Sequence, residues 1–206
     1  MHYKELLNKK TKTGLLITSL SGLTLLIISF ILGRERFFLL LNGDGGYFTD
    51  SFFAIWTSLG EAIAWVIVAV LFYFYQKDKL ILYFASLIFS TILTQFLKHI
   101  VFEDVKRPTA AISDVSQIHT VTGVELYTAN SFPSGHTATA FTIFLLACLL
   151  INKKWVVPFG FLAALLVGYS RIYLAQHFPI DVGGGMLVAV FTILLSVWIQ
   201  KKWGKV

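Results

Sequence analysis

Long apolar runs separated by short polar connections dominate the chain, and this pattern predicts an all-α polytopic membrane protein. About 20 apolar residues in a helix are enough to cross the hydrocarbon core of a bilayer. Six predicted spans follow one another at 14–32, 52–75, 80–97, 133–151, 155–169 and 182–200. No repeat or linker divides them, so we expect residues 1–206 to form a single integral-membrane domain.

The connections between these spans differ greatly in length. Residues 76–79 and 152–154 form tight turns, whereas residues 98–130 make the longest polar connection. The short apolar segment 34–41 cannot cross a bilayer, so it is either an interfacial helix or a plain loop. The first span lacks a small-residue cleavage site after it, which favours a retained span over a signal peptide.

Composition and charge agree with a membrane protein and set its orientation. Hydrophobic residues make up 56% of the 206 residues and charged residues only 14%, too apolar a balance for a soluble domain of this size. Eleven of the 17 Lys and Arg residues, but only two of the 11 acidic residues, lie in the two termini and the two tight turns. The positive-inside rule therefore predicts that both termini are cytoplasmic. This topology explains the net charge of +6, and no nucleic-acid partner is predicted.

The polar segment 170–181 lies between the fifth and sixth predicted spans, where a charged side chain is costly unless it has a function. Pro179 favours the start of a helix, so Asp181 can fold back onto the imidazole of His177, four residues earlier. A carboxylate on one ring nitrogen leaves the other free as a nucleophile. Arg171 offers planar donors suited to a phosphate. The alternative is a polar loop whose ion pair caps a helix.

The head of the fourth predicted span carries a second polar group. Pro133 suits a helix start and Ser134 is a natural N-cap, so free backbone N–H groups would point outward as an anion site. Gly135 permits close approach of a ligand, and His136 lies on the first turn, where it can donate a proton. An ordinary cap with a histidine at the membrane interface is the alternative.

The long connection supplies the remaining basic residues on the same predicted side of the membrane. Lys98 lies at the membrane edge, where it either contributes to a site or extends its ammonium group to the headgroups. Arg107 and Pro108 follow. His99 and His119 have no partner at a metal-ligand spacing, and we expect both to be surface residues.

Together these segments resemble the three signature motifs of the type 2 phosphatidic acid phosphatase superfamily. Its bacterial membrane branch includes phosphatidylglycerophosphatase B and undecaprenyl pyrophosphate phosphatases. The matching residues are Lys98…Arg107-Pro108, Pro133-Ser134-Gly135-His136 and Ser170-Arg171…His177…Asp181. The second and third motifs match fully, whereas the first encloses eight residues between its lysine and arginine, more than the family pattern.

The resemblance implies a mechanism. His177 would attack phosphorus and form a phosphohistidine, Asp181 would orient it, and His136 would protonate the leaving group and then activate water. The phosphate would be bound by Lys98, Arg107, Ser134, Gly135 and Arg171. The sequence shows no set of metal ligands, so we expect a metal-independent enzyme without a cofactor.

The expected substrate is a lipid phosphate from the bilayer, because the site would lie at the outer surface of the cytoplasmic membrane. Phosphatidylglycerol phosphate is favoured over undecaprenyl pyrophosphate and phosphatidate. A phosphatase of a water-soluble phosphate and a membrane transporter are the alternatives, although a transporter would place polar residues near the bilayer midplane. The segment 109–132 would either cover the pocket or act only as a tether, and glycines 183–185 predict close helix packing. The sequence makes no prediction of the oligomeric state.

Overall fold

The computed structural model describes residues 7–203, and within this range it contains helices and no strand, which confirms the all-α prediction. The helices are α2 (Lys9–Leu32), α3 (Arg34–Leu41), α4 (Tyr47–Trp56), α5 (Ala62–Tyr75), α6 (Leu80–Phe96), α7 (Pro108–Ala111), α8 (Gly135–Leu150), α9 (Val156–Tyr173) and α10 (Pro179–Trp203). Short 3-10 turns lie at η1 (Thr57–Gly60), η2 (Lys77–Lys79) and η4 (Val115–Gln117), and a π-helical turn, η3 (Leu97–Val101), ends α6.

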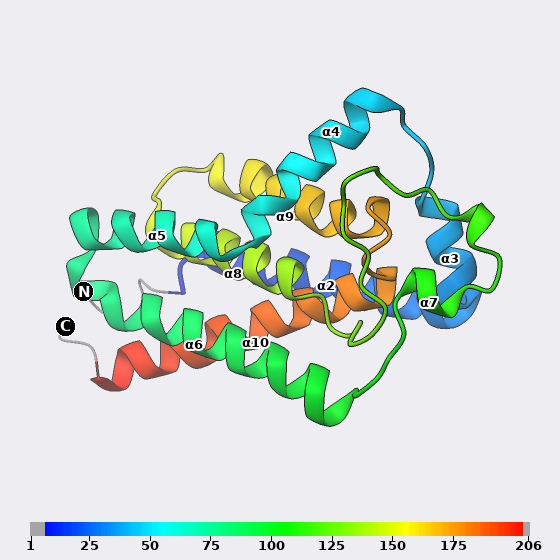
Figure 1. Ribbon diagram of the computed structural model, residues 1–206. Helices are drawn as coiled ribbons and strands as arrows, with labels where there is room; N and C mark the ends of the chain where they lie inside the picture. Colours follow the sequence, from blue (N-terminus) through cyan, green and yellow to red (C-terminus); the bar gives the residue numbers. More distant parts are fainter. Residues whose placement is uncertain (1–6, 204–206) are drawn as a thin grey trace.

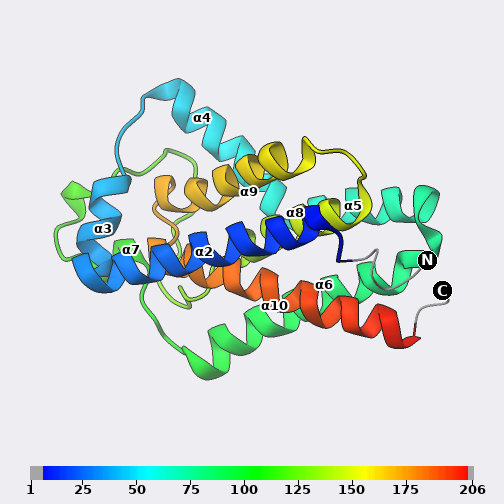
Figure 2. The same ribbon diagram turned by 180° about the vertical axis from the view of Figure 1, so that it is seen from behind.

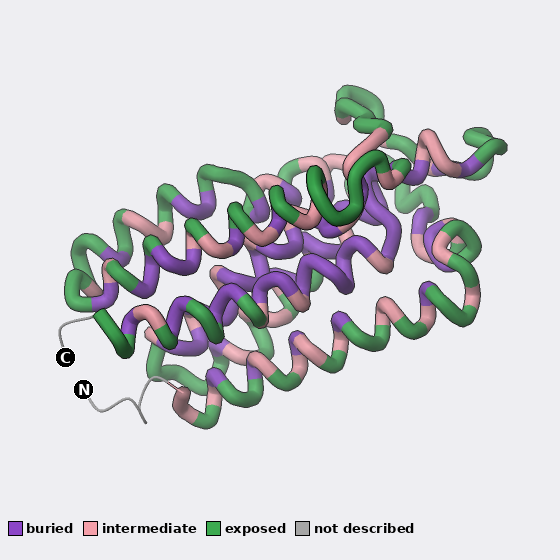
Figure 3. Tube along the Cα trace, turned by 90° about the horizontal axis from the view of Figure 1, so that it is seen from below, coloured by how far each residue is buried: buried purple, intermediate pink, exposed green. Residues whose placement is uncertain are grey.

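The long helices run side by side (Figure 1). Helix α10 packs against α2, α6 and α8, and α8 packs in turn against α9. Seen from behind, α2 lies across α10 (Figure 2). Burial follows this arrangement, because the buried positions concentrate on the inward faces of the helices (Figure 3). Large apolar side chains such as Phe30 and Phe74 remain exposed on the outside, as expected for surfaces that face lipid.

Four helical segments are long and apolar enough to cross a membrane: Lys9–Leu32, Lys77–Val101, Val156–Tyr173 and Pro179–Trp203. The predicted second span is not one continuous helix, because Tyr47–Gly60 and Ala62–Tyr75 meet at a bend of 53°. Counted as one span, this bent pair makes five. Helix α8, the predicted fourth span, is apolar but only 16 residues long. The fold is therefore that of a helical membrane protein, with fewer helices of full spanning length than predicted.

The two ends of the bundle are different. The start of α2, the connection between α5 and α6 and the end of α10 lie at one end, whereas α3, α7 and the long connection lie at the other (Figures 1 and 2). Segment 34–41 is helical, which excludes the plain loop. Lys4, Glu5 and Lys205, which entered the charge count, lie outside the described residues.

Three glycines at the start of α10 allow close contact with its neighbours, as predicted. A β-carbon at Gly183 would lie 2.7 Å from the carbonyl oxygen of Gly22 on α2, and one at Gly185 would lie 2.6 Å from the carbonyl oxygen of Ser134. The backbone N–H of Ser134 also donates to the carbonyl oxygen of Asp181, at 2.9 Å. The first turns of α8 and α10 are therefore fixed directly against each other.

Gly185→Ala should separate these two turns, because its new methyl group overlaps a backbone oxygen that has little freedom to move. We expect a loss of about 1–3 kcal/mol in stability, the usual cost of overpacking. Thermal unfolding of the purified protein in detergent measures the effect. Gly43→Ala is the control, since nothing lies within 4 Å of its β-carbon position. Equal melting temperatures for the two variants would contradict the proposed constraint.

Candidate active site

A polar cavity of about 510 Å³ lies at the end of the bundle where α6 ends and α8 begins. It brings together residues from all three sequence segments. The predicted site residues that line it are Lys98, Arg107, Gly135, His136, Arg171 and His177. The other two predicted residues, Ser134 and Asp181, do not line the cavity but are buried behind it.

The loop after α9 holds His177, one of the two histidines of the predicted site. The backbone N–H groups of Gln176 and His177 both donate to the carbonyl oxygen of Arg171, at 2.9 and 3.0 Å. Ala175 adopts a left-handed conformation with φ of 54°, which turns the chain back over the end of α9. Helix α10 begins at Pro179, as predicted, so Asp181 lies on its first turn.

The His177–Asp181 pair has the predicted geometry. The imidazole Nδ1 lies 3.4 Å from the carboxylate Oδ2 of Asp181. The same oxygen accepts hydrogen bonds from the Ser131 hydroxyl and from the backbone N–H of Phe178. These bonds fix the carboxylate, and through it the ring of His177 with its Nε2 left free for the cavity.

Burial and charge both favour the neutral form of this imidazole. The His177 side chain is only 2% exposed, and its desolvation lowers its pKa well below the usual range. The cationic groups of Arg107, Lys98 and Arg171 lower the pKa of His177 further. A neutral ring whose Nδ1–H is held by a carboxylate presents a lone pair at Nε2, which is the state that a nucleophile requires.

Two arginines place guanidinium groups beside this histidine. Arg107 donates from Nε to the carbonyl oxygen of Ala129 at 2.9 Å, and from Nη1 to that of Gln176 at 3.1 Å. Arg171 donates from Nη1 to the Thr57 hydroxyl at 2.6 Å, while its buried Nε has no hydrogen-bond partner. The hydrogen bonds aim both guanidinium groups without neutralising them.

Lys98 completes the set of three cations. Its ammonium group donates to the carbonyl oxygen of Asn130 at 2.9 Å. The residue lies on η3, and the interval before Arg107 also contains Asp104 in a left-handed conformation. These two irregular turns occur within the long interval of the first motif, and Lys98 still lines the cavity. Single π-helical turns are frequent at functional sites.

None of these three cations forms an ion pair with a carboxylate among residues 7–203. Buried charges are costly unless an opposite charge or a polar ligand compensates them. The charge of the cavity therefore favours an anion over a neutral or cationic ligand. A phosphate group, with oxygens that accept charge-assisted hydrogen bonds, has the matching chemistry.

The second histidine lies on the first turn of α8. Ser134 is the N-cap of this helix, as predicted, since its hydroxyl oxygen accepts from the backbone N–H of Thr137. His136 points its Nε2 toward the carboxylate of Glu61, at 3.5 Å. Glu61 is not among the site residues that the sequence predicted. Gly60 makes the approach close, because a β-carbon there would lie 2.8 Å from that of His136.

The long connection forms a wall of the cavity. Residues 127–130 line it, and the backbone N–H of Arg107 donates to the carbonyl oxygen of Thr128 at 2.9 Å. The ring of Tyr127 also lies 5.2 Å from the guanidinium carbon of Arg107. Of the two alternatives for segment 109–132, a cover over the pocket is therefore the one that these contacts support.

Sequence reasoning missed the polar residues that hold the predicted site in place. Thr57, Ser131 and Gln176 are all buried and each bonds to a predicted site residue. Only their position in the sequence could have indicated Ser131 and Gln176, which lie in the segments 109–132 and 170–181. Thr57 lies near the start of the predicted span 52–75, and nothing in the sequence connects it with Arg171.

His119 is not the free surface residue that was predicted. Its side chain is 13% exposed, and its Nε2 lies 3.0 Å from the carboxylate of Asp50, which also accepts from the Tyr173 hydroxyl. Ligand atoms of Asp44, Asp50 and His119 lie within 4.8 Å of one another, away from the residues that line the cavity. These contacts tie the long connection to α4 and α9.

The apolar bundle and its polar cavity define a helical membrane protein in which cationic and histidine side chains gather at one end. Residues 79–205 match the family model of the PAP2 superfamily. The match covers more than half of the chain, and the protein belongs to this superfamily.

Two curated relatives illustrate the similarity. An undecaprenyl-diphosphatase of Sulfolobus acidocaldarius is 40% identical over 70 residues, which are 34% of this chain and 34% of that relative. The chain thus spans about a third of the length of this relative. The bacitracin transport permease protein BcrC of Bacillus licheniformis is 29% identical over 161 residues, covering 76% of this chain and 70% of the relative.

Two crystal structures share the fold. LpxE of Aquifex aeolicus is 30% identical, with a TM-score of 0.68 over 78% of this chain and 92% of the other. A PAP2-type phosphatidylglycerolphosphate phosphatase of Bacillus subtilis is 22% identical, with a TM-score of 0.63 over 96% of this chain and 99% of the other. The second likeness concerns the fold alone.

Lys98→Ala should weaken anion binding, because it removes one of three uncompensated cations. A hydrogen bond to a charged group contributes about 1.5–3 kcal/mol, so orthovanadate, as a phosphate mimic, should bind at least about tenfold more weakly. Isothermal titration with orthovanadate measures this. Lys106→Ala is the matched control, since Lys106 is exposed and does not line the cavity. If Lys98→Ala bound orthovanadate as tightly as the wild-type protein, Lys98 would serve only as a membrane anchor.

Proposed function

We propose that this protein is a membrane phosphatase that removes a phosphate group from a lipid through a phosphohistidine intermediate. The observation that carries the proposal is the buried His177–Asp181 pair facing three cations that have no carboxylate partner. Membership of the PAP2 superfamily supports it, because relatives and solved structures of similar sequence or fold are named as phosphatases.

The cavity residues suggest how the reaction would proceed. Lys98, Arg107 and Arg171 would bind the phosphate oxygens, and Gly135 would complete the cradle at the start of α8, with Ser134 capping that helix behind the cavity. The lone pair of His177 Nε2 would attack phosphorus as the bond to the leaving oxygen breaks. Asp181 would stabilise the positive charge that develops on the ring.

His136 would handle the protons. In the first step it would donate a proton to the oxygen that leaves with the lipid, and in the second it would accept one from water. That water would attack the phosphohistidine, break the N–P bond and release inorganic phosphate together with neutral His177. The carboxylate of Glu61 beside His136 would hold the ring and stabilise its protonated form.

We further propose that the reaction needs neither a metal ion nor another cofactor. The three cations would supply the charge compensation that magnesium provides in many phosphoryl-transfer enzymes. No carboxylate is among the residues that line the cavity, so the pocket offers no ligand set of the kind that magnesium prefers.

The proposed topology is one domain with six spans in the cytoplasmic membrane, both termini cytoplasmic and the active site outside. The bent pair and α8 would be the second and fourth spans. The excess of basic residues at the termini and tight turns supports this orientation. The cavity lies where α6 ends and α8 begins. The start of α2, the α5–α6 connection and the end of α10 lie at the opposite end of the bundle (Figure 1).

Phosphatidylglycerol phosphate, undecaprenyl pyrophosphate and phosphatidate are the substrates to compare, because relatives are named for the first two. Phosphate release by purified protein, with a chelator present, tests all three against glycerol 3-phosphate, a water-soluble phosphate. Phosphate release from glycerol 3-phosphate alone would favour the alternative of a phosphatase that acts on a water-soluble phosphate.

Transport is the second alternative function, since one relative is named a permease. The polar residues at one end of the bundle favour chemistry over a midplane transport site.

His177→Ala should abolish phosphate release, because it removes the ring nitrogen that would attack phosphorus, and His136 would act only on protons. A single turnover with ³²P-labelled lipid should leave an acid-labile label on the wild-type protein and none on the variant. Circular dichroism and thermal unfolding establish that the variant remains folded. Near-normal release by a folded His177→Ala protein would show that the nucleophile is assigned wrongly.

Glu61→Gln should slow substrates that depend on His136 as an acid. An alkoxide leaving group needs a proton, so we expect about 10–100-fold slower hydrolysis of a lipid monoester, within the usual range for acid catalysis. Formation of the phosphohistidine from p-nitrophenyl phosphate, whose leaving group needs no proton, should change little in rate. Equal losses on both substrates would indicate a structural role for Glu61.

A further inference from the structure

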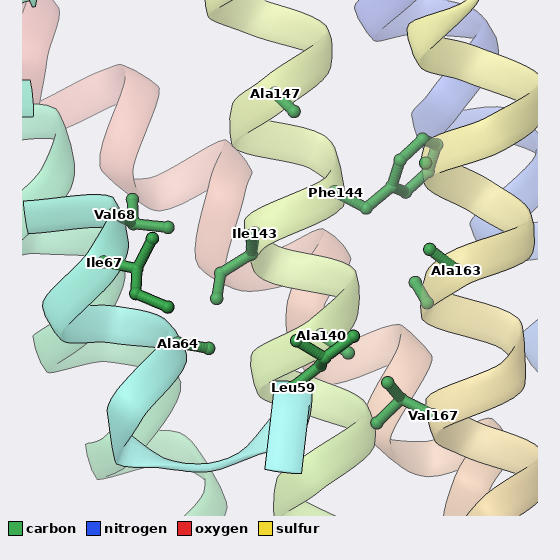
Figure 4. A pocket seen from close by; sticks show the side chains of 12 residues that line it. Leu59, Ala64, Ile67, Val68, Ala140, Ile143, Phe144, Ala147, Ala163 and Val167 are labelled. Atoms are coloured by element: carbon green, nitrogen blue, oxygen red, sulfur yellow. The ribbon is translucent and has the colours of Figure 1, made fainter. Parts of the chain in front are cut away.

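An apolar groove of about 260 Å³ lies between α5, α8 and α9 (Figure 4). Small residues on these helices leave the space open, among them Ala64, Ala140, Ala147, Gly160 and Ala163. Its lining contains no charged side chain. The groove is therefore suited to a hydrocarbon chain and not to a polar ligand.

The groove begins directly below the cavity described above. On α8, Ala140 of the groove follows His136 by four residues, and on α9, Val167 precedes Arg171 by four residues. Four residues of helix are about 6 Å, or one turn. Gly60 packs between the two spaces, because its β-carbon position lies 2.8 Å from the β-carbon of His136 and 2.9 Å from a methyl group of Val167.

A second apolar cavity, of about 340 Å³, continues the groove toward the other end of α8. Both are lined by Val68, Ile143 and Ala147. The second cavity reaches Ile151, so the groove and this cavity together form a track along α8 from Ala140 to Ile151. At 1.5 Å per residue this distance is about 17 Å. The track is therefore about as long as the roughly 15 Å depth of one leaflet's hydrocarbon.

We propose that this track between α5 and α8 binds one hydrocarbon chain of the lipid whose phosphate occupies the cavity. This proposal rests on the proposed function and extends it to the hydrocarbon chain of the substrate, which would decide specificity among lipid phosphates. The alignment of the two spaces on the same helices argues for one molecule that fills both. Chain length would then determine affinity, since each buried methylene contributes about 0.8 kcal/mol.

The test fills the track and compares two substrates. Ile143 is half-buried in the groove, whereas Ile92 on α6 is 57% exposed and lines none of these cavities. Ile143→Trp should lower kcat/KM for a long-chain lipid phosphate at least about tenfold, the equivalent of two buried methylenes. Its kcat/KM for p-nitrophenyl phosphate should stay within about twofold, and Ile92→Trp should leave both substrates unaffected. Ala147→Phe, with Ala62→Phe as its control, repeats the comparison if the first variant does not fold.

Labelling with a lipid phosphate that carries a diazirine in mid-chain provides a second measurement. Cross-links should map to α5 and α8, and excess unlabelled substrate should remove them. Labelling that excess substrate does not reduce would mean that the track holds bulk bilayer lipid, which overturns the proposal. If Ile143→Trp lowered kcat/KM equally for both substrates, or for neither, that result would also overturn the proposal. A wild-type protein that releases no phosphate from any substrate would instead refute the proposed function.

Discussion

The contact between the first turns of α8 and α10 determines the geometry of the whole site. Ser134 donates its backbone N–H to the carbonyl oxygen of Asp181, and Gly185 has no side chain to separate the two turns. One helix carries His136, and the other carries the carboxylate that orients His177. A small shift between these helices would therefore move both histidines relative to the cations. The close backbone contact keeps the groups at a fixed separation.

The remaining support for the site comes from segments without spanning length. The broken helix at η1 supplies Thr57 to Arg171 and Glu61 to His136. The long connection supplies carbonyl oxygens to Lys98 and Arg107. Neutral carbonyl oxygens can orient cations without cancelling their charge, so these contacts prepare the site for an anion. The site thus combines charges from the helix ends with fixed acceptors from irregular segments.

The sequence predicted the parts of this arrangement that depend on local pattern. Apolar run length predicted the helices, Ser134 and Pro179 predicted two helix starts, and the four-residue spacing predicted that Asp181 would reach His177. The bend at Gly60 could not be predicted from the length of the apolar run, and the residue that packs against it, His136, lies 76 positions away in the chain. The same holds for Thr57 and for His119 with Asp50, whose partners come from distant segments. Pairing across the fold leaves no periodic signal in a single sequence.

The three unpaired cations have a consequence for the end of the proposed catalytic cycle. The inorganic phosphate that one turnover would set free carries roughly the same charge as the group that was bound at the start. Nothing in the lining of the cavity repels it, since no carboxylate lies there. The departing ion would therefore leave slowly and compete with the next lipid. Turnover by such an enzyme would fall as the phosphate concentration around the cell rises, which would couple lipid dephosphorylation to external phosphate supply.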